Sequence, residues 1–192
     1  MVAAIFLFVT SSPSEEVVFS HSVEGLFTRA LGGEVPPALQ EQLRGLGLDL
    51  GKKLMPAYPV RVWNQVLEAT VHALYPGDPM PKAARLIGER MMHGYRATLV
   101  GGAVLALAKI IGPRRALLRS RQNWRSGNNY SEVKVEELAP KDFRLTFNES
   151  GISRWISQGL LAAGLTFAGA SEASVEVAEF SQSEVVYRIT WK

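Results

Sequence analysis

Cysteine is absent from the 192 residues, and histidine occurs only three times. Without cysteine the chain forms no disulfide, thiolate metal site or iron–sulfur cluster, and it has no cysteine nucleophile. His21, His72 and His93 are far apart in sequence, and none has a second histidine four residues along a helix. Because a metal ion needs several ligands at suitable spacing, we expect no metal site.

Long apolar segments are also lacking. The N-terminal run "AAIFLFV" at residues 3–9 is much shorter than the about 20 apolar residues that span a bilayer. It also lacks the preceding basic region of a secretory signal. We therefore expect residues 1–18 to form a short strand or docking arm, no transmembrane segment elsewhere, and a cytoplasmic location.

The familiar catalytic motifs do not occur. There is no G-x-S-x-G, no phosphate-binding glycine loop ending in Lys-Ser/Thr, and no G-x-G-x-x-G after a predicted strand. The neighbouring acids Glu136 and Glu137 fall on a predicted strand and so point to opposite faces. We expect no catalytic residue, no cofactor and no enzymatic activity.

The composition that remains is that of a globular protein, with 47% hydrophobic and 20% charged residues. The net charge of +3 permits an anionic partner without requiring one. A chain of this length is most simply one domain. We expect a helical half at residues 19–125 and a strand-rich half at residues 126–192.

Proline and glycine divide the first half into helices. The pattern predicts helices in "PPALQEQLRGLG" (residues 36–47) and "VRVWNQVLEATVHALY" (residues 60–75). A longer helix is predicted from Lys82 to Ile111. The "GP" pair at residues 112–113 should end this helix and begin a shorter, basic one.

In the second half the apolar period changes to two. A hairpin is predicted from "YSEVKVEEL" (residues 130–138) and "FRLTFNE" (residues 143–149). A helix at residues 153–169 and strands at residues 174–180 and 184–192 follow. The sequence therefore predicts an α+β fold, in which the helical half packs on a C-terminal ββαββ unit with a four-stranded antiparallel sheet.

This arrangement resembles the superfold shared by four-vinyl-reductase-type domains, TRAPP vesicle-tethering subunits and haem nitric-oxide/oxygen-binding domains. "WISQGLLAAGLTFAGASEASVEVAEF" and "VVYRITW" are similar to its glycine-containing helix, valine-alternating strand and closing aromatic strand. Across nearly the whole chain, "VEGLFTRAL", "GLDL", "YPVRVWNQVLEA", "LIGERMMHGYRATLVG" and "NNYSEVKVEEL" resemble an uncharacterised paralogous family of myxobacterial proteins.

The resemblance implies a pocket between the helices and the sheet, used for haem, acyl chains or other hydrophobic ligands, and often a helix-mediated homodimer. Haem domains of this type pair a histidine with a Tyr-x-Ser-x-Arg motif, and the segment Tyr130-Ser131-Glu132 departs from that motif. The cysteines of acylated TRAPP subunits and of four-vinyl-reductase domains are missing.

The candidate pocket residues centre on His93, which lies on an otherwise apolar helix. His93 could be a haem or metal ligand, a polar residue of a pocket, or a structural histidine. If a cavity exists, some of the aromatic residues should wall it, although most should be core. The ligand-binding candidates are Trp63, His93, Tyr95, Arg96, Phe147 and Trp155.

Glycines in the predicted long helix need an explanation, because each costs about 1 kcal/mol relative to alanine. Gly94, Thr98 and Gly101 share one helix face. This face either lets another backbone come close or leaves room for a ligand. Gly159 and Ala163 form a similar small-residue face, which we expect where the later helix crosses the sheet.

Arginines cluster in "RRALLRSRQNWR", where Leu117 and Trp124 should face inward. The cluster is either a solvated face or a site for an acidic protein, phosphate or anionic lipid. No motif supports sequence-specific nucleic-acid binding. The candidate anion- or partner-binding residues are Arg114, Arg115, Arg119, Arg121 and Arg125.

Three functional hypotheses follow. The first is a non-catalytic sensor domain that holds a small hydrophobic or lipid-like molecule and passes its occupancy to a protein partner or a dimer mate. The second is an interaction adaptor with a filled core that binds through the arginine helix. The third is a haem-binding gas sensor.

Overall fold

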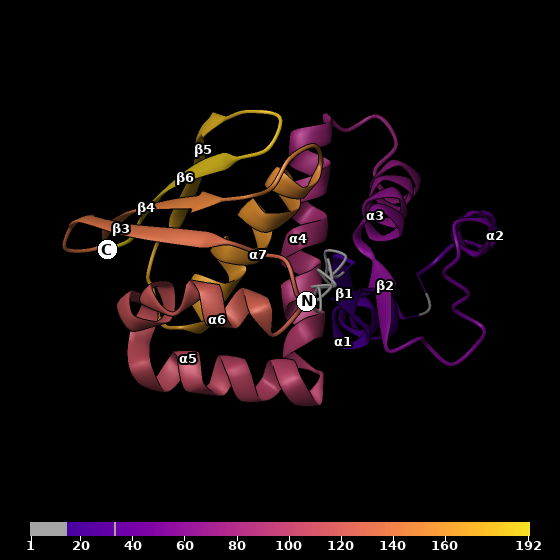
Figure 1. The fold of residues 1–192 in the computed structure, drawn as a ribbon, viewed down its shortest axis with the longest axis horizontal. Coiled ribbons are helices and arrows are strands. Elements are labelled where there is room, and N and C mark those ends of the chain that lie inside the picture. The colour runs from indigo at the N-terminus through magenta and orange to yellow at the C-terminus, as the bar shows by residue number, and fades with distance from the viewer. Residues whose placement is uncertain (1–14, 33) are drawn as a thin grey trace, which may run out of the picture.

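The computed structural model describes residues 15–32 and 34–192 (Figure 1). The apolar run at residues 3–9 lies outside the described residues. Two short strands, β1 (Val17–Phe19) and β2 (Ala57–Pro59), pair antiparallel with each other. β1 is followed directly by α1 (Ser20–Val23), which continues into a π-helical segment, η1 (Glu24–Ala30). β2 is followed directly by α3 (Val60–Leu74).

The predicted helices at the two proline-led segments are present. α2 (Pro37–Gly45) begins at a proline, whose missing N–H costs nothing in the first helical turn. α3 buries Trp63, Val66 and Leu67 on one face, as its apolar period requires. α4 (Met80–Arg96) then runs through the middle of the molecule, with α3 on one side and the sheet on the other (Figure 1).

The single long helix predicted from Lys82 to Ile111 is wrong, because the chain turns between α4 and α5 (Leu99–Leu118). The two helix axes differ by 96°. Thr98 has an extended backbone, and its Oγ accepts a hydrogen bond from the Gly101 N–H at 3.0 Å, which caps the new helix. At Gly101 any added Cβ would overlap the Tyr95 carbonyl oxygen, so glycine is what permits the tight turn.

The second predicted break is confirmed. Within α5, Gly112 has φ 80° and ψ 166°, a backbone conformation that glycine adopts readily, and Pro113 follows it. The short helix α6 (Ser120–Arg125) comes next, and α5 and α6 lie side by side below the rest of the molecule in Figure 1. The basic segment is thus divided between the end of α5 and α6.

The C-terminal part has the predicted ββαββ order. It consists of β3 (Val133–Ala139), β4 (Asp142–Phe147), α7 (Ser153–Phe167), β5 (Ser174–Phe180) and β6 (Val185–Thr190). The spatial order is β3-β4-β6-β5 and every neighbouring pair is antiparallel, which confirms the predicted fold class. The alternating residues Phe143, Leu145 and Phe147 are fully buried on one face of the sheet.

Two hydrophobic cores meet along α7. The helical core joins residues from α1, η1, α2, α3 and α4 to Ile156 and Leu160 of α7. The sheet core joins β3–β6 to Leu161 and Leu165 of the same helix. Since α7 contributes to both cores, it ties the helical part to the sheet.

The crossing of α4 and α7 explains the small residues of these helices. A Cβ at Gly88 would overlap the Ile156 carbonyl oxygen, and a Cβ at Gly159 would overlap the Arg85 carbonyl oxygen. Gly159 therefore lies where α7 crosses α4, which corrects the expectation that it lies over the sheet. Gly94 makes a similar close approach to the backbone of Gly25 in η1, which is the first of the two explanations given for it. The expectation that Gly94, Thr98 and Gly101 share one helix face is wrong, because the helix breaks at Thr98 and Gly101 belongs to α5.

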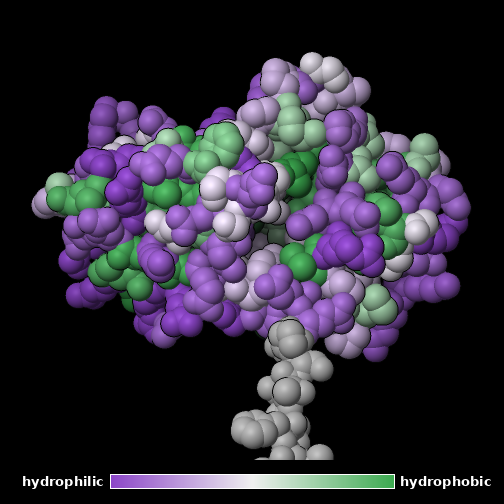
Figure 2. Space-filling model, turned by 45° about the horizontal axis from the view of Figure 1, so that its top comes forward, coloured by the Kyte–Doolittle hydropathy of each residue, from purple (hydrophilic) through white to green (hydrophobic). Residues whose placement is uncertain are grey.

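Hydrophobic residues reach the surface in places. Figure 2 shows them at several places on this face, some of them in a hollow near its centre that hydrophilic residues border. The outer side of α5 also exposes Leu99, Leu107 and Ile110. Within residues 15–32 and 34–192, no single helix has the length and apolar character to cross a membrane, although α4 and α5 reach that length and composition together as a bent pair.

Candidate functional site

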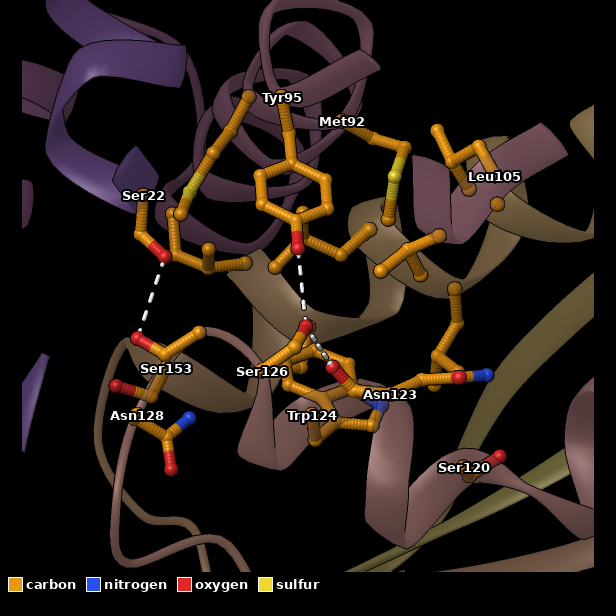
Figure 3. A pocket seen from close by; sticks show the side chains of 18 of the residues that line it. Ser22, Met92, Tyr95, Leu105, Ser120, Asn123, Trp124, Ser126, Asn128 and Ser153 are labelled. Atoms are coloured by element: carbon orange, nitrogen blue, oxygen red, sulfur yellow. Dashed lines mark hydrogen bonds between the residues drawn. The ribbon is translucent and has the colours of Figure 1, made fainter. Parts of the chain in front are cut away.

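A cavity of about 160 Å³ lies between α3, α4, α5, α6 and α7 (Figure 3). An engineered cavity of about 150 Å³ with an apolar lining binds benzene. The cavity in this chain therefore has room for one small ring without any rearrangement.

The cavity walls are mainly apolar and come from helices that are distant in sequence. α3 contributes Trp63 and Leu67, and α6 contributes Trp124. The remaining large apolar side chains are Val18 of β1, Met91 and Met92 of α4, Val104, Leu105 and Leu117 of α5, and Ile156, Leu160, Leu161 and Leu165 of α7.

The position of the cavity corrects the sequence-based expectation of a pocket between the helices and the sheet. None of the residues of β3–β6 that the structure describes lines it. The sheet core covers the buried face of the sheet, and three of its residues, Leu117, Leu161 and Leu165, form part of the cavity wall. Most of the cavity wall therefore comes from helices, and Val18 of β1 and the loop residues Asn128, Tyr130 and Glu149 complete it.

Hydroxyl and amide groups occupy one edge of the cavity. The Tyr95 hydroxyl shares a 2.9 Å hydrogen bond with Ser126 Oγ, and Ser126 Oγ donates to the Asn123 carbonyl at 2.6 Å (Figure 3). Burial raises the pKa of Tyr95. The phenol therefore stays neutral, and it acts as a hydrogen-bonding group that faces the apolar walls.

Glu149 is the one acidic residue of the described lining, and the sequence analysis did not single it out. It follows β4 in a loop that Asn148 holds in place. Asn148 Oδ1 accepts from the Glu132 N–H at 2.7 Å, and its Nδ2 donates to the Tyr130 carbonyl at 3.2 Å. The sequence did contain a pattern that indicates an inward-facing Glu149. This residue continues the alternation of Phe143, Leu145 and Phe147, whose side chains all face the core.

The carboxyl group of Glu149 is buried and incompletely paired. The residue is 7% exposed, and among the described residues its Oε2 has no hydrogen-bond partner. Burial raises its pKa to about 7, a shift that the Ser157 hydroxyl opposes only in part. Burying a polar group without a partner is costly, so Glu149 has an unused capacity to bind something in the cavity.

Of the residues predicted from α3 and α4, Trp63 and Tyr95 line the cavity. His93 and Arg96 do not line it. The His93 ring is 5.0 Å from the Phe167 ring, and the Arg96 guanidinium is 4.9 Å from the same ring. Both residues are exposed.

The two aromatic candidates near the sheet also lie outside the cavity. Phe147 is fully buried in the sheet core, where its ring contacts Trp124 and Tyr187 edge to face. Trp155 packs against the helical core, and its ring centre lies 6.3 Å from that of Phe180. The inward alternation placed Phe147 in the core correctly but could not distinguish the core from a cavity wall.

Acidic residues of this chain already bind much of the arginine cluster. Arg114 makes a bidentate pair with Glu137 at 2.8 and 2.6 Å, and Arg121 and Arg125 both pair with Glu132. Arg114 lies on α5, whereas Arg121 and Arg125 lie on α6.

Arg119 and Arg115 have different surroundings. Arg119 Nε donates to Gln122 Oε1 at 3.2 Å, and Arg115 is exposed. Leu117 and Trp124, the inward-facing pair of this segment, line the cavity. The described residues contain no group of three or more His, Cys, Asp or Glu side chains that could hold a metal ion.

The fold is that of H-NOX proteins. The Cs H-NOX mutant with 4-cyano-L-phenylalanine is 14% identical and covers 91% of this chain and 96% of its own, with a TM-score of 0.68. A T. Tengcongensis H-NOX mutant is 15% identical over 90% of this chain and 96% of its own, with a TM-score of 0.63. The Fe(II) unliganded H-NOX protein from K. algicida is 13% identical over 90% and 95%, with a TM-score of 0.62.

At the level of sequence family, the chain belongs to DUF2378, described as a protein of unknown function, whose family model matches residues 16–192. No curated protein matches the chain in sequence. At identities this low, the similarity to the solved structures is a similarity of fold.

Proposed function

We propose that this chain is a non-catalytic binding domain that holds one small apolar molecule in the cavity between α4, α5 and α7, as part of a sensor. The observation that carries the proposal is the cavity itself. It has room for one ring, its walls are mainly apolar, and a few polar groups at its edge can orient a ligand. The domain would act in the cytoplasm and transmit its occupancy to a protein partner or a second copy of the chain.

Haem is the group that this fold implies, because one of the similar structures concerns haem redox potential and another contains Fe(II). The residues present do not fit it. Among the described lining residues there is no histidine to bind the iron and no Lys or Arg to pair with the two propionates. A haem is also several times larger than the one-ring ligand that the cavity admits.

None of the three histidines lines the cavity, and His72 is exposed on α3. His21 Nε2 lies 2.5 Å from the Ser126 carbonyl oxygen, and His93 contacts Phe167. A buried carboxyl group at Glu149 would repel the propionates of a haem. A small neutral or cationic organic molecule fits the same surroundings better.

The adaptor hypothesis has less support. It requires a filled core and available arginines, whereas the core contains a cavity and Glu132 and Glu137 already pair with three of the five arginines.

A cavity-filling variant tests the proposal. Gly164 lines the cavity, and a Cβ added there meets only Met92 Cε, at 3.4 Å. Gly164→Leu should therefore fill the cavity while raising helix propensity by up to about 1 kcal/mol. Thr166→Leu adds an apolar side chain at an exposed position of the same helix and serves as the control.

The readout is titration with benzyl alcohol, followed by calorimetry and by the fluorescence of Trp63 and Trp124 in the cavity wall. We expect the natural chain and Thr166→Leu to bind and Gly164→Leu to lose binding. Unchanged binding by Gly164→Leu, or no binding by the natural chain, would show that the cavity is not a ligand site.

A further inference from the structure

We propose that the cavity selects a small organic cation, an ammonium group on a body about the size of one ring, and that the Glu149 carboxylate is its counter-ion. This inference rests on the proposed function and adds the chemical class of the ligand. It is carried by the unpaired carboxyl oxygen, the absence of any basic side chain from the described lining, and the aromatic residues around it.

The first step concerns the hydrogen-bond donors near Glu149. The Tyr187 hydroxyl donates to the Arg154 carbonyl at 2.6 Å, so its hydrogen is not available to the carboxyl group. Tyr95 shares its hydroxyl bond with Ser126. The Ser157 hydroxyl acts on the same carboxyl group, but Oε2 has no donor among the described residues. An ammonium group supplies both donors and the opposite charge.

The second step concerns the nearest basic residue. Arg154 lies at the start of α7, but its guanidinium group is directed elsewhere. Its Nε donates to the Gly151 carbonyl at 2.9 Å, and its carbon atom lies 4.1 Å from the centre of the Phe180 ring. No cation of the described lining competes with a ligand for Glu149.

The third step concerns the walls. Trp63, Tyr95, Trp124 and Tyr130 all line the cavity. Aromatic rings attract cations through their quadrupoles, and the attraction grows when the site is desolvated. An acid among aromatic residues is a favourable setting for an organic cation and an unfavourable one for an anion of the same size.

The charges that face Glu149 from neighbouring elements leave this selection intact. Ser157 on α7 is a neutral neighbour of Glu149. The titratable neighbours are Tyr130, which precedes β3, and Tyr187 on β6. Burial raises the pKa of both phenols, so they stay neutral. Glu16, near Tyr130, adds negative charge. Arg154 acts on Tyr187 from outside the cavity, and among the described lining residues Glu149 is the one that can carry a charge at neutral pH.

The experiment compares three probes of nearly the same shape: benzylamine, benzyl alcohol and benzoate. Calorimetric titrations use the full chain, its Glu149→Gln variant, and Glu136→Gln, which removes an exposed acid from β3 as a matched control. Each titration is run at about pH 8.5 and about pH 5.5, where an acid with a pKa near neutrality is mostly ionised and mostly protonated.

At the higher pH we expect benzylamine to bind the natural chain at least about tenfold more tightly than benzyl alcohol, and benzoate to bind most weakly. The benzylamine preference should shrink at the lower pH and should disappear in Glu149→Gln at both. Glu136→Gln should behave like the natural chain. The pH series on the natural chain gives the same information independently of any variant.

The two proposals fail differently. Equal affinity for benzylamine and benzyl alcohol at the higher pH would overturn the cation proposal, and so would a benzylamine preference that survives in Glu149→Gln. In both cases the binding of benzyl alcohol would still support the cavity as a ligand site. If none of the three probes binds, the proposed function is overturned and the cation proposal with it.

Discussion

Replacing Glu149 with Gln should change how the stability of the protein depends on pH. The folded protein raises the pKa of this carboxyl group from 4.5 to about 7 because it is buried. The unfolded chain releases the proton first as pH rises, so the folded protein holds more protons between these two values and loses stability there. Below about pH 4.5 the group is protonated in both states, and above about pH 7 the loss is complete.

The magnitude follows from the width of that interval. About 2.5 pH units at about 1.36 kcal/mol per unit give a loss of about 3 kcal/mol between pH 4.5 and 7, as an upper value. Gln is uncharged throughout and cannot lose stability in this way. The free energy of unfolding of Glu149→Gln relative to the natural chain should therefore rise by up to about 3 kcal/mol from about pH 4 to about pH 8.

The assay is urea unfolding followed by circular dichroism at a series of pH values, with Glu136→Gln as the control. Any constant difference in packing between Glu and Gln cancels, because only the change with pH is compared. A difference that does not vary with pH would refute the reasoning, and so would a relative loss of stability by Glu149→Gln at high pH.

Two further substitutions test the packing. Gly159→Ala should destabilise the fold by about 1–3 kcal/mol, because the new methyl group overlaps the Arg85 carbonyl oxygen. Gly164→Ala on the same helix has room for its methyl group and should be neutral or stabilising in the same urea unfolding measurement. Equal effects of the two substitutions would contradict the close crossing of α4 and α7. Arg125→Gln should cost about 1–3 kcal/mol, because it removes the 2.8 Å bond from Nε to the Ser131 carbonyl and the pair with Glu132. Arg115→Gln should change the free energy of unfolding by less than about 0.5 kcal/mol. If Arg115→Gln destabilised the fold as much as Arg125→Gln, the contacts of Arg125 would have no special structural role.

Much of the fold could be predicted because local patterns determine it. The alternation of Phe143, Leu145 and Phe147 assigns one sheet face to the core, and the same period identifies the pairing strands. The break at Thr98 could not be predicted in this way. Apolar and small residues continue across it at helical spacing, and the turn depends on how Gly101 meets the Tyr95 carbonyl, a contact that exists only in three dimensions.

The candidate site was harder to predict than the fold. Trp63, Tyr95 and His93 were all predicted to line a pocket. Trp63 and Tyr95 do line the cavity, whereas His93 is exposed and lies outside it. Glu149 was missed because an acid in a loop between a strand and a helix is ordinarily exposed. Its burial follows from the way Asn148 ties that loop to residues 130–132.

The crossing of α4 and α7 makes one side of the molecule stiff. Their backbones meet at Gly88 and Gly159, which leaves no side-chain layer that could compress. We expect a ligand larger than one ring to displace α5 rather than the α4–α7 crossing, because α5 is interrupted at Gly112 and joins α4 through the turn at Thr98. Leu99 and Ile110, which α5 exposes, would move with that helix.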